Sequence, residues 1–327
     1  MKVLLLGASG LLGHNVLRRL VDEGHEVVAL VRRPDAIRLE TSSFEQHVGS
    51  LLDYPMLSAA ARGCDAVVNC AGTTDMSLLH RSDYMPVNCE LCRMLVRLLE
   101  EHGISTLVHT STANTIGYGT SGRPADESWP MLKPFTKSHY AESKRLGEGI
   151  VLDAARRWPE RHIIVINPGF MIGPYDVKPS SGRLLEVAYR RRLMVAPSGG
   201  KSFVHVGDVA QAVVNALTMG RNGERYLAVN SHGNLSIKEI YRMQASLMGY
   251  RQCVVTVPDW MLSVAGFAGD VLRWTGIRTE VATRNVRQLM VREYYSNHHA
   301  ASELHMPETP VSDAIKSFFQ WRQNINH

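Results

Sequence analysis

The chain begins with Lys2-Val-Leu-Leu-Leu6-Gly7-Ala-Ser-Gly10-Leu-Leu-Gly13, in which a short apolar run leads directly into three evenly spaced glycines. The apolar run suits a strand buried in a parallel sheet, and the residues after Gly10 follow a helical pattern through Val21. A strand, a glycine turn and a helix in this order bring free backbone N–H groups to the positive end of a helix dipole, which favours a phosphate. A glycine turn that binds no ligand is the alternative.

The glycines are spaced G-x-x-G-x-x-G, whereas the dinucleotide fingerprint is G-x-G-x-x-G. The roles of the fingerprint can still be assigned. Gly7 would make the tight turn, Gly10 would let the backbone approach a ligand, and Gly13 would let the helix pack closely on the sheet. The stretch therefore predicts a dinucleotide-binding turn.

A second apolar run, 26–31, ends in Arg32-Arg33-Pro34. In a dinucleotide-binding fold the end of this strand meets the adenosine ribose, where a carboxylate binds the 2′-hydroxyl and an arginine accommodates a 2′-phosphate. Because a guanidinium offers a planar donor fork to a phosphate, Arg32 and Arg33 favour NADP over NAD. Asp35 lies just beyond them and keeps NAD open, and two solvated arginines that only close a strand are the other interpretation.

Strand and helix alternate through the first half of the chain. The predicted strands are 2–6, 26–31, 44–48, 65–70, 106–110 and 163–167, and the predicted helices lie near 11–22, 55–62, 82–102 and 137–157. This alternation predicts a parallel sheet covered on both faces, with ligands at the carboxyl ends of its strands. Because 327 residues exceed what one simple core usually holds, we expect a second lobe, in which the sequence predicts helices at 236–248, 258–275 and 310–321.

Tyr140 and Lys144 stand one helical turn apart in Tyr140-Ala-Glu-Ser-Lys144. This spacing points both side chains the same way, so we expect the ammonium to lower the pKa of the phenol and make it a proton donor and acceptor near neutral pH. Alone, the pair is weak evidence, since two such residues fall at this spacing by chance on many helices.

The composition argues against several other classes of protein. The net charge of +5 is modest and scattered, so we expect no nucleic-acid partner. The run Arg190-Arg191-Arg192 is interpreted as a solvated helix end, with contact to an anionic substrate as the alternative. The five cysteines show no paired metal spacing, so no metal site is expected. The N-terminal apolar run is too short for a signal peptide, and the expected compartment is the cytoplasm.

Two further segments have structural interpretations. Residues 260–268 are apolar enough to suggest membrane contact, but Gly266, Gly269 and Asp270 interrupt the run below spanning length, so no membrane span is expected and a buried helix or a hydrophobic substrate wall is favoured. Asp208 is interpreted as a helix N-cap rather than a catalytic acid, and His205 as a core or supporting residue rather than a base.

Together the motifs resemble a known family, the extended short-chain dehydrogenases/reductases, and within it the dihydroflavonol-4-reductase-like branch of the NAD-dependent epimerase/dehydratase group. The resemblance covers the whole chain and is strongest over residues 1–230. It rests on six motifs in family order: Gly7-Ala-Ser-Gly10-Leu-Leu-Gly13, Asp65-Ala-Val-Val-Asn69-Cys-Ala71-Gly72, Thr110-Ser111-Thr112-Ala113, Tyr140-Ala-Glu-Ser-Lys144, Asn167-Pro168-Gly169-Phe-Met-Ile-Gly173-Pro174 and Phe203-Val-His205-Val-Gly-Asp208-Val-Ala210.

The resemblance implies a Rossmann-type doubly wound parallel sheet with a smaller, mostly helical C-terminal substrate lobe. Residues 1–168 would form the dinucleotide-binding domain, to which 203–230 return, and residues 169–202 and 231–327 would form the lobe. The catalytic residues it implies are Thr112, Tyr140, Lys144 and Asn88. The cofactor-binding residues are Gly7, Ser9, Gly10, Leu11, Leu12, Gly13, Arg32, Arg33, Leu52, Asp53, Cys70, Ala71, Gly72, Thr110, Ser111, Tyr140, Lys144, Pro168, Gly169 and Met171.

In these terms Tyr140 is the acid/base, Lys144 binds the nicotinamide ribose, and Thr112 or its neighbour Ser111 hydrogen-bonds the substrate oxygen. The favoured function is reduction of a ketone or aldehyde with NADPH, on a small-molecule carbonyl substrate bound by the loops 73–84, 114–135 and 173–200. One alternative is a nucleotide-sugar epimerase or dehydratase with tightly bound NAD, and another is a non-catalytic protein that senses NADP. The family also implies a homodimer through helices 82–102 and 137–157.

Overall fold

Seven parallel strands form the central sheet of the computed structural model, which describes residues 1–37, 44–177, 180–277, 279 and 281–325. Their spatial order is β10-β6-β5-β4-β1-β2-β3. The strands are β1 (Lys2–Leu6), β2 (Glu26–Val31), β3 (Phe44–Val48), β4 (Ala66–Asn69), β5 (Thr106–Thr110), β6 (His162–Pro168) and β10 (Arg225–Ala228). Every strand predicted for the first half of the chain is present. Because the strand order reverses between β1 and β4, the ends of these two strands flank the crevice where such sheets bind ligands.

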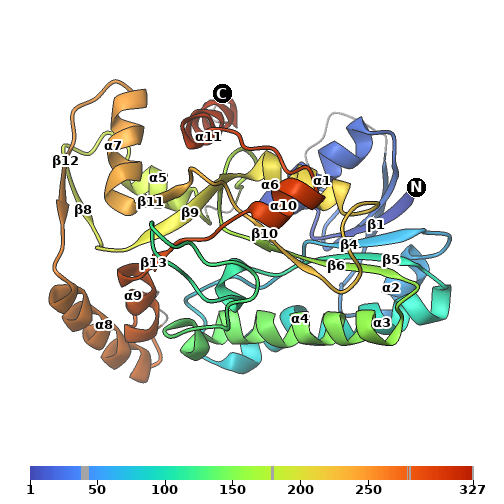
Figure 1. Ribbon diagram of the computed structural model, residues 1–327. Helices are drawn as coiled ribbons and strands as arrows, with labels where there is room; N and C mark the ends of the chain where they lie inside the picture. Colours follow the sequence, from blue (N-terminus) through green and yellow to red (C-terminus); the bar gives the residue numbers. More distant parts are fainter. Residues whose placement is uncertain (38–43, 178–179, 278, 280, 326–327) are drawn as a thin grey trace.

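Helices cover both faces of the sheet (Figure 1). On one face lie α1 (Leu11–Asp22), α6 (Val206–Asn215) and α10 (His298–Glu303). On the other lie α2 (Tyr54–Ala60), α3 (Leu91–His102) and α4 (His139–Arg157). The alternate residues of β1 divide between the two cores, with Val3 and Leu5 on the first face and Leu4 and Leu6 on the second. The doubly wound α/β fold predicted from the sequence is confirmed.

The helix predicted over 82–102 is divided in the structure. A 3₁₀ turn at Arg81–Asp83 is followed by a π-helical stretch, Pro86–Glu90, and α3 begins only at Leu91. Proline has no N–H to donate, which weakens regular α-helical bonding at this point. Gly147 of α4 packs here so closely that a Cβ would lie 2.0 Å from the carbonyl oxygen of Asn88. The irregular stretch therefore lies directly against the helix that carries Tyr140 and Lys144.

The second lobe contains short strands as well as helices. Its elements are β7 (Phe170–Ile172), α5 (Arg183–Ala188), β8 (Leu193–Ala196), β9 (Gly200–His205), β11 (Asn234–Ser236), α7 (Ile237–Leu247), β12 (Cys253–Thr256), α8 (Asp259–Trp274), α9 (Thr283–Met290), β13 (Arg292–Glu293) and α11 (Val311–Ile325). The strands escaped sequence prediction because runs this short carry too little periodicity. The three helices predicted here are present as α7, α8 and α11.

The predicted boundary between the lobes stays a prediction. Two features bear on how the chain divides. The sequence placed α10 in the second lobe, but Ala300 of this helix and Leu304 just after it belong to the core on one face of the central sheet. The second lobe has an apolar core of its own, in which Phe318 of α11 packs with Ile172 and Ile240. Among the described residues, no helix is both long and apolar enough to cross a bilayer.

Candidate active site

The glycine turn joins β1 to α1 with no room for side chains at two of its positions. Gly7 has φ +84°, and a Cβ there would lie 2.6 Å from the backbone nitrogen of Ala71. A Cβ on Gly13 would lie 2.0 Å from the carbonyl oxygen of Gly7. Both contacts are to backbone, which cannot move aside as a flexible side chain could. These glycines therefore hold the end of β1, the loop after β4 and the start of α1 against one another.

The first turn of α1 has the properties of a phosphate site. Its N-cap, Gly10, supplies no capping side chain, and the first turn contains no acidic residue. Ser9 and Gly10 are exposed, whereas Leu12 and Gly13 are buried. The backbone N–H groups at a helix N-terminus have no partner within the helix, and they point toward the end of the helix where the dipole is positive. The turn therefore fits the diphosphate of a dinucleotide.

The predicted adenosine end lies at the carboxyl ends of β2 and β3. Arg32 and Arg33 are exposed at the end of β2, and the Nε of Arg33 lies 4.0 Å from a carboxylate oxygen of Asp35. Asp53 is the N-cap of α2, where its carboxylate accepts a hydrogen bond of 3.3 Å from the backbone N–H of Met56. Leu52 beside it is exposed. The arginines are thus free of the core and placed next to the glycine turn, because β1 and β2 are neighbouring strands.

The loop after β4 is held by backbone and amide hydrogen bonds. Cys70 donates its N–H to the carbonyl of Leu6 at 2.9 Å, and Ala71 donates its N–H to the side-chain oxygen of Asn69 at 3.0 Å. Asn88 is fully buried, and its amide oxygen accepts from the backbone N–H of Thr73 at 2.8 Å. Gly72, between them, is exposed. This part of the crevice therefore presents backbone rather than ionisable groups.

Asn88 joins that loop to the helix of Tyr140. Its amide nitrogen donates to the carbonyl of Thr73 at 3.0 Å and to the hydroxyl of Ser143 at 2.9 Å. Ser143 in turn donates to the carbonyl of Tyr140 at 2.7 Å. Because both N–H groups of the amide are engaged, the structure favours a positioning role for Asn88, although the sequence grouped it with the catalytic residues.

Tyr140 and Lys144 lie in the first two turns of α4, which Ser138 caps by accepting from the N–H of Ala141. Lys144 is buried, and its ammonium donates to the carbonyl of Thr110 at 2.6 Å. Burial lowers the pKa of Lys144 from its usual value. The carboxyl end of β5 and the start of α4 are therefore joined through this ammonium.

The expected lowering of the Tyr140 pKa by Lys144 is wrong. Burial raises the pKa of the phenol, and a hydrogen bond with the Thr112 side chain opposes that rise only in part. Lys144 is not among the groups that shift this pKa, and its ammonium donates to the carbonyl of Thr110. Tyr140 is consequently a protonated donor throughout the neutral range.

Thr112 is held in place by a buried network. The hydroxyl of Thr112 accepts from the N–H of Asn114, and its carbonyl accepts from the amide of Asn167 at 3.1 Å. The same amide donates to a carboxylate oxygen of Glu148 at 2.9 Å, and the hydroxyl of Thr115 donates to that oxygen at 2.8 Å. Ser111, the alternative to Thr112, has a buried hydroxyl with no hydrogen-bond partner among the described residues.

Glu148 is the residue that sequence reasoning missed. It is buried, and its other carboxylate oxygen lies 3.1 Å from the guanidinium of Arg225 on β10. The signal was available, since Glu148 continues the one-turn spacing of Tyr140 and Lys144 along the same face of α4. A buried carboxylate that is paired and hydrogen-bonded gives the Thr112 turn a fixed geometry.

The residues after β6 lie beside those after β5, because the two strands are neighbours. Gly169 donates its N–H to the carbonyl of Ala228 at 3.1 Å, and a Cβ on Gly169 would lie 2.5 Å from the carbonyl oxygen of Ser202. Met171 lies on β7 opposite Val204 of β9. Pro168, Gly169 and Met171 therefore lie where the central sheet passes into the second lobe.

The N-cap role predicted for Asp208 belongs to His205. The ring Nδ1 of His205 accepts from the N–H of Gly207 at 2.9 Å at the start of α6. Asp208 lies in the first turn, where its carboxylate accepts from the backbone N–H and the hydroxyl of Thr309, each at 2.7 Å. Asp208 therefore joins the first turn of α6 to the segment before α11.

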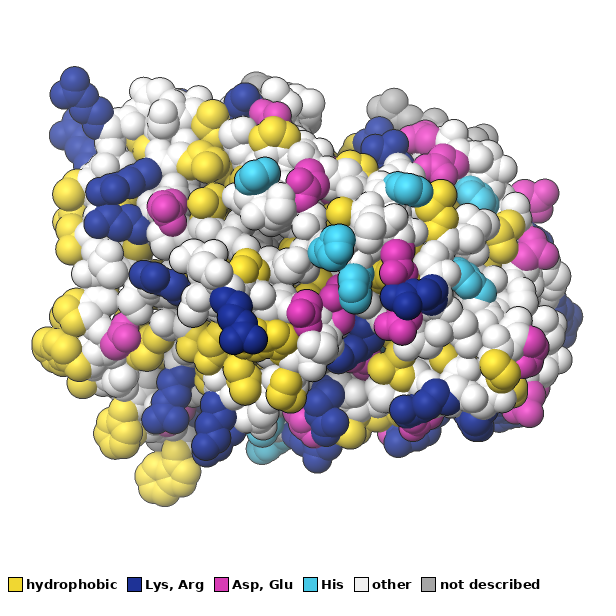
Figure 2. Space-filling model, viewed as in Figure 1, with side chains coloured by type: hydrophobic (Ala, Val, Ile, Leu, Met, Phe, Trp, Pro, Cys, Tyr) yellow, Lys and Arg dark blue, Asp and Glu magenta, His cyan; other side chains and the backbone are white. Residues whose placement is uncertain are grey.

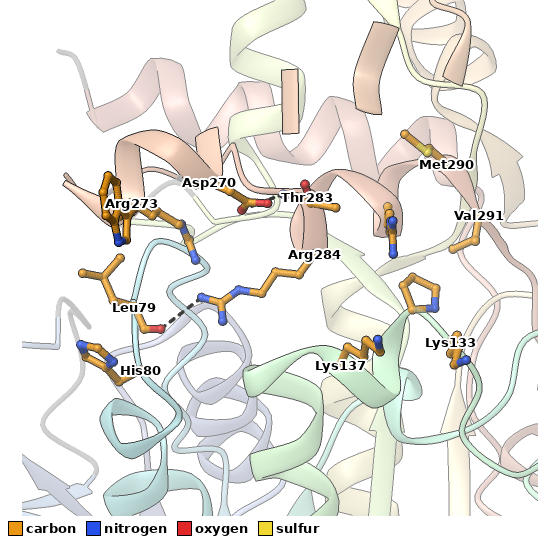
Figure 3. A pocket seen from close by; sticks show the side chains of 13 residues that line it. Leu79, His80, Lys133, Lys137, Asp270, Arg273, Thr283, Arg284, Met290 and Val291 are labelled. Carbon is orange, nitrogen blue, oxygen red and sulfur yellow. Dashed lines mark hydrogen bonds between the residues drawn. The ribbon is translucent and has the colours of Figure 1, made fainter. Parts of the chain in front are cut away.

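A pocket of about 840 Å³ lies between the start of α4 and the helices α8 and α9 (Figure 3). Its basic lining residues are His80, Lys133, Lys137, Arg273, Arg284 and Arg287. Arg273 and Arg284 point toward the loop that carries Leu79 and His80, and they donate to backbone carbonyls there, Arg273 to Met76 and Arg284 to Leu78, each at 2.8 Å. The exposed run 190–192 lies outside this lining.

The pocket adjoins the predicted catalytic residues. Lys137 lies three positions before Tyr140, and the charges of Arg284 and Arg273 add to burial in lowering the pKa of His139. The rings of Tyr84 and Tyr140 lie 6.5 Å apart. Burial raises the pKa of Tyr84, and the charge of Arg284 opposes that rise in part. Tyr140 itself is not among the described residues that line the pocket.

Comparison with known proteins places the chain in a family. Residues 3–230 match the model of the NAD-dependent epimerase/dehydratase family, which is more than half of the chain. The chain belongs to this family. The resemblance drawn from the sequence is thereby confirmed, and the protein is an NAD(P)-dependent enzyme of the extended short-chain dehydrogenase/reductase type. Reductases and epimerases both occur among its relatives.

Two curated relatives illustrate this range. A protein of Synechocystis sp. named "Putative dihydroflavonol 4-reductase" is 29% identical over 97% of this chain and 93% of its own length. The N-acetyl-α-D-glucosaminyl-diphospho-ditrans,octacis-undecaprenol 4-epimerase of Escherichia coli O157:H7 is 26% identical over 88% of this chain and 84% of its own length. The crystal structure of gox2253 superposes with a TM-score of 0.82 at 28% identity, covering 99% of this chain and 98% of that one.

Proposed function

We propose that the protein reduces a ketone or aldehyde with NADPH, with Tyr140 as the proton donor. The observation that carries the proposal is the contact of the Tyr140 phenol with the Thr112 side chain, at the carboxyl end of β5 and beside the buried ammonium of Lys144. Two hydroxyl groups that meet at a strand end, next to a cation, can both bind one substrate oxygen.

The crevice between β1 and β4 fits a nicotinamide dinucleotide. The turn at Gly7–Gly13 would hold the diphosphate, Arg32 and Arg33 would hold a 2′-phosphate, and Lys144 would bind the nicotinamide ribose. When bound, the nicotinamide supplies the hydride that carbonyl reduction requires. The exposed guanidiniums at the end of β2 support NADP rather than NAD, because a planar donor fork suits a phosphate.

The protein's own residues then act on the carbonyl oxygen. Negative charge develops on this oxygen as the carbon is reduced, and hydrogen bonds from Tyr140 and Thr112 become stronger as it does so. Tyr140 gives up its proton to the oxygen, and the hydrogen bond with the Thr112 side chain favours the phenolate that remains. The raised pKa of Tyr140 favours the reducing direction, since the phenol is protonated at neutral pH.

A second function is favoured by one observation. The pocket beside Tyr140 has six basic lining residues and a single acidic one, Asp270, which suits a substrate bearing phosphate groups. The relative from E. coli is named for a diphosphate-linked sugar. An epimerase or dehydratase acting on a sugar diphosphate with retained NAD is therefore the second candidate, and it would use the same Tyr140, Lys144 and Thr112.

The test is a screen of carbonyl compounds and nucleotide sugars with NADPH and with NADH, followed at the absorbance band of the reduced nicotinamide. The proposal predicts oxidation of NADPH by a carbonyl compound and loss of this signal in Tyr140→Phe. Protein that is purified with NAD already bound, and that converts a nucleotide sugar with no net change in the band, would replace the proposal with the second candidate.

A further inference from the structure

Helix α8 carries a stripe of exposed apolar side chains along one face. The stripe consists of Trp260, Val264, Phe267, Val271 and Trp274, which follow one another at intervals of four and three residues and therefore lie on one line of the helix. Their exposed fractions are 68, 62, 68, 48 and 89% in that order. Monomeric proteins seldom leave so much contiguous apolar and aromatic surface to water without a partner for it.

The other side of α8 fixes the helix to the lobe through its backbone. A Cβ on Gly269 would lie 1.5 Å from the carbonyl oxygen of Val281, and one on Gly266 would lie 2.9 Å from the Cα of Thr283. These glycines are the buried residues of α8. The carboxylate of Asp270 accepts from the N–H of Thr283, the first residue of α9, at 3.1 Å. The expectation of a buried helix at 260–268 is therefore wrong, because Trp260, Val264 and Phe267 are exposed, whereas the alternative expectation of a hydrophobic substrate wall stays a prediction.

Basic side chains lie beside the stripe. Arg273 is on α8 itself, Arg284 and the exposed Arg287 are on α9, and Lys133 and Lys137 lie across the pocket. The space-filling view shows hydrophobic side chains gathered over α8 at the lower left of the molecule, with Lys and Arg side chains next to them (Figure 2). An apolar face bordered by positive charge is complementary to a layer that has hydrocarbon beneath anionic headgroups.

We propose that the α8 stripe docks the protein on the surface of an anionic lipid bilayer. Indole and phenyl rings of the stripe enter the boundary between headgroups and acyl chains, while the exposed Arg287, Lys133 and Lys137 contact lipid phosphates. Trp274 belongs both to the stripe and to the lining of the pocket, so docking brings the pocket to the membrane surface. This inference goes beyond the proposed function and does not depend on it.

A second copy of the chain fits the stripe less well. In a two-fold dimer the same patch meets itself, so two stripes packed together would bring the arginines beside them into proximity as well. Like charges placed opposite one another at an interface are unfavourable. A bilayer of opposite charge has no such conflict.

The test is flotation of the full-length protein with vesicles of phosphatidylcholine alone and of phosphatidylcholine with phosphatidylserine. We expect the protein to float with the anionic vesicles, to bind them less as salt is raised, and to lose about tenfold or more of the bound fraction in the triple variant Trp260→Ser, Val264→Ser, Phe267→Ser. The matched control is the double variant Val187→Ser, Met219→Ser, which removes exposed apolar side chains from other elements and should float like the parent.

Two further measurements complete the test. Lipids brominated on their acyl chains should quench the tryptophan fluorescence of the parent protein. They should not quench the remaining tryptophan fluorescence of the double variant Trp260→Phe, Trp274→Phe, which should still bind the vesicles. Circular dichroism should show the same melting temperature for the triple variant, because none of its three residues is buried. Absence of flotation in the parent, equal flotation of parent and triple variant, or a parent dimer that the triple variant converts to monomer without any vesicle binding would each overturn the proposal.

Discussion

Replacing Arg32 and Arg33 by alanine should change the choice of cofactor. Both guanidiniums are exposed at the end of β2, so their removal leaves the core and the glycine turn untouched. A hydrogen bond to a charged group contributes about 1.5–3 kcal/mol, and screening by solvent places an exposed one at the low end of that range. Since about 1.4 kcal/mol corresponds to a factor of ten, each substitution should weaken NADPH binding about tenfold and the double variant about a hundredfold.

The affinity for NADH should change by less than about twofold, because NADH has no 2′-phosphate for the arginines to hold. Titration of the protein with each reduced cofactor, followed by nicotinamide fluorescence, measures both constants. Arg156→Ala, which removes an equally exposed arginine from the far end of α4, is the control and should change neither. Equal weakening of NADPH and NADH in the double variant would refute the assignment of these arginines to a 2′-phosphate.

Three other perturbations test the rest of the site. Gly13→Ala should abolish dinucleotide binding, because the added Cβ would lie 2.0 Å from the carbonyl oxygen of Gly7. The control is Gly149→Ala on α4, whose Cβ would meet no atom within 4 Å. This control should raise the free energy of unfolding by about 0.4–1 kcal/mol in urea titrations. Glu148→Gln should cost about 1–3 kcal/mol of unfolding free energy and reduce kcat, because Arg225 loses its buried charge partner; unchanged values for both would contradict the network. Because burial raises the pKa of Tyr140 from its ordinary value, the rate of carbonyl reduction should be level through neutral pH and fall only in alkali, while alcohol oxidation should rise with pH; an oxidation rate that levels off below neutrality would count against this phenol.

The parts of the fold that the sequence predicts well are those with strong local signals. The run from Lys2 to Gly13 determines the first strand, the turn and the helix, and the structure shows why two of its glycines have no room for a side chain. The apolar runs of the central sheet are equally clear, because strands buried on both faces read as continuous hydrophobic stretches.

Features that depend on distant contacts could not be predicted in the same way. The raised pKa of Tyr140 follows from burial, which is not visible in the spacing of two residues. Asp208 is bound to Thr309, about a hundred positions away, so its local pattern indicated a cap that His205 provides. The apolar stretch at 260–268 looked like a buried helix, because sequence alone does not show which of its faces meets the protein.

The most direct test of the account is Tyr140→Phe, measured for turnover and for NADPH affinity in the same preparation. The substitution removes the one hydroxyl that is proposed to give its proton to the substrate oxygen and leaves the glycine turn, Arg32 and Lys144 unchanged. We expect a fall in kcat of about a hundredfold or more, with a dissociation constant for NADPH within about twofold of the parent value. Turnover that survives the substitution, or turnover and NADPH affinity that fall together, would contradict it.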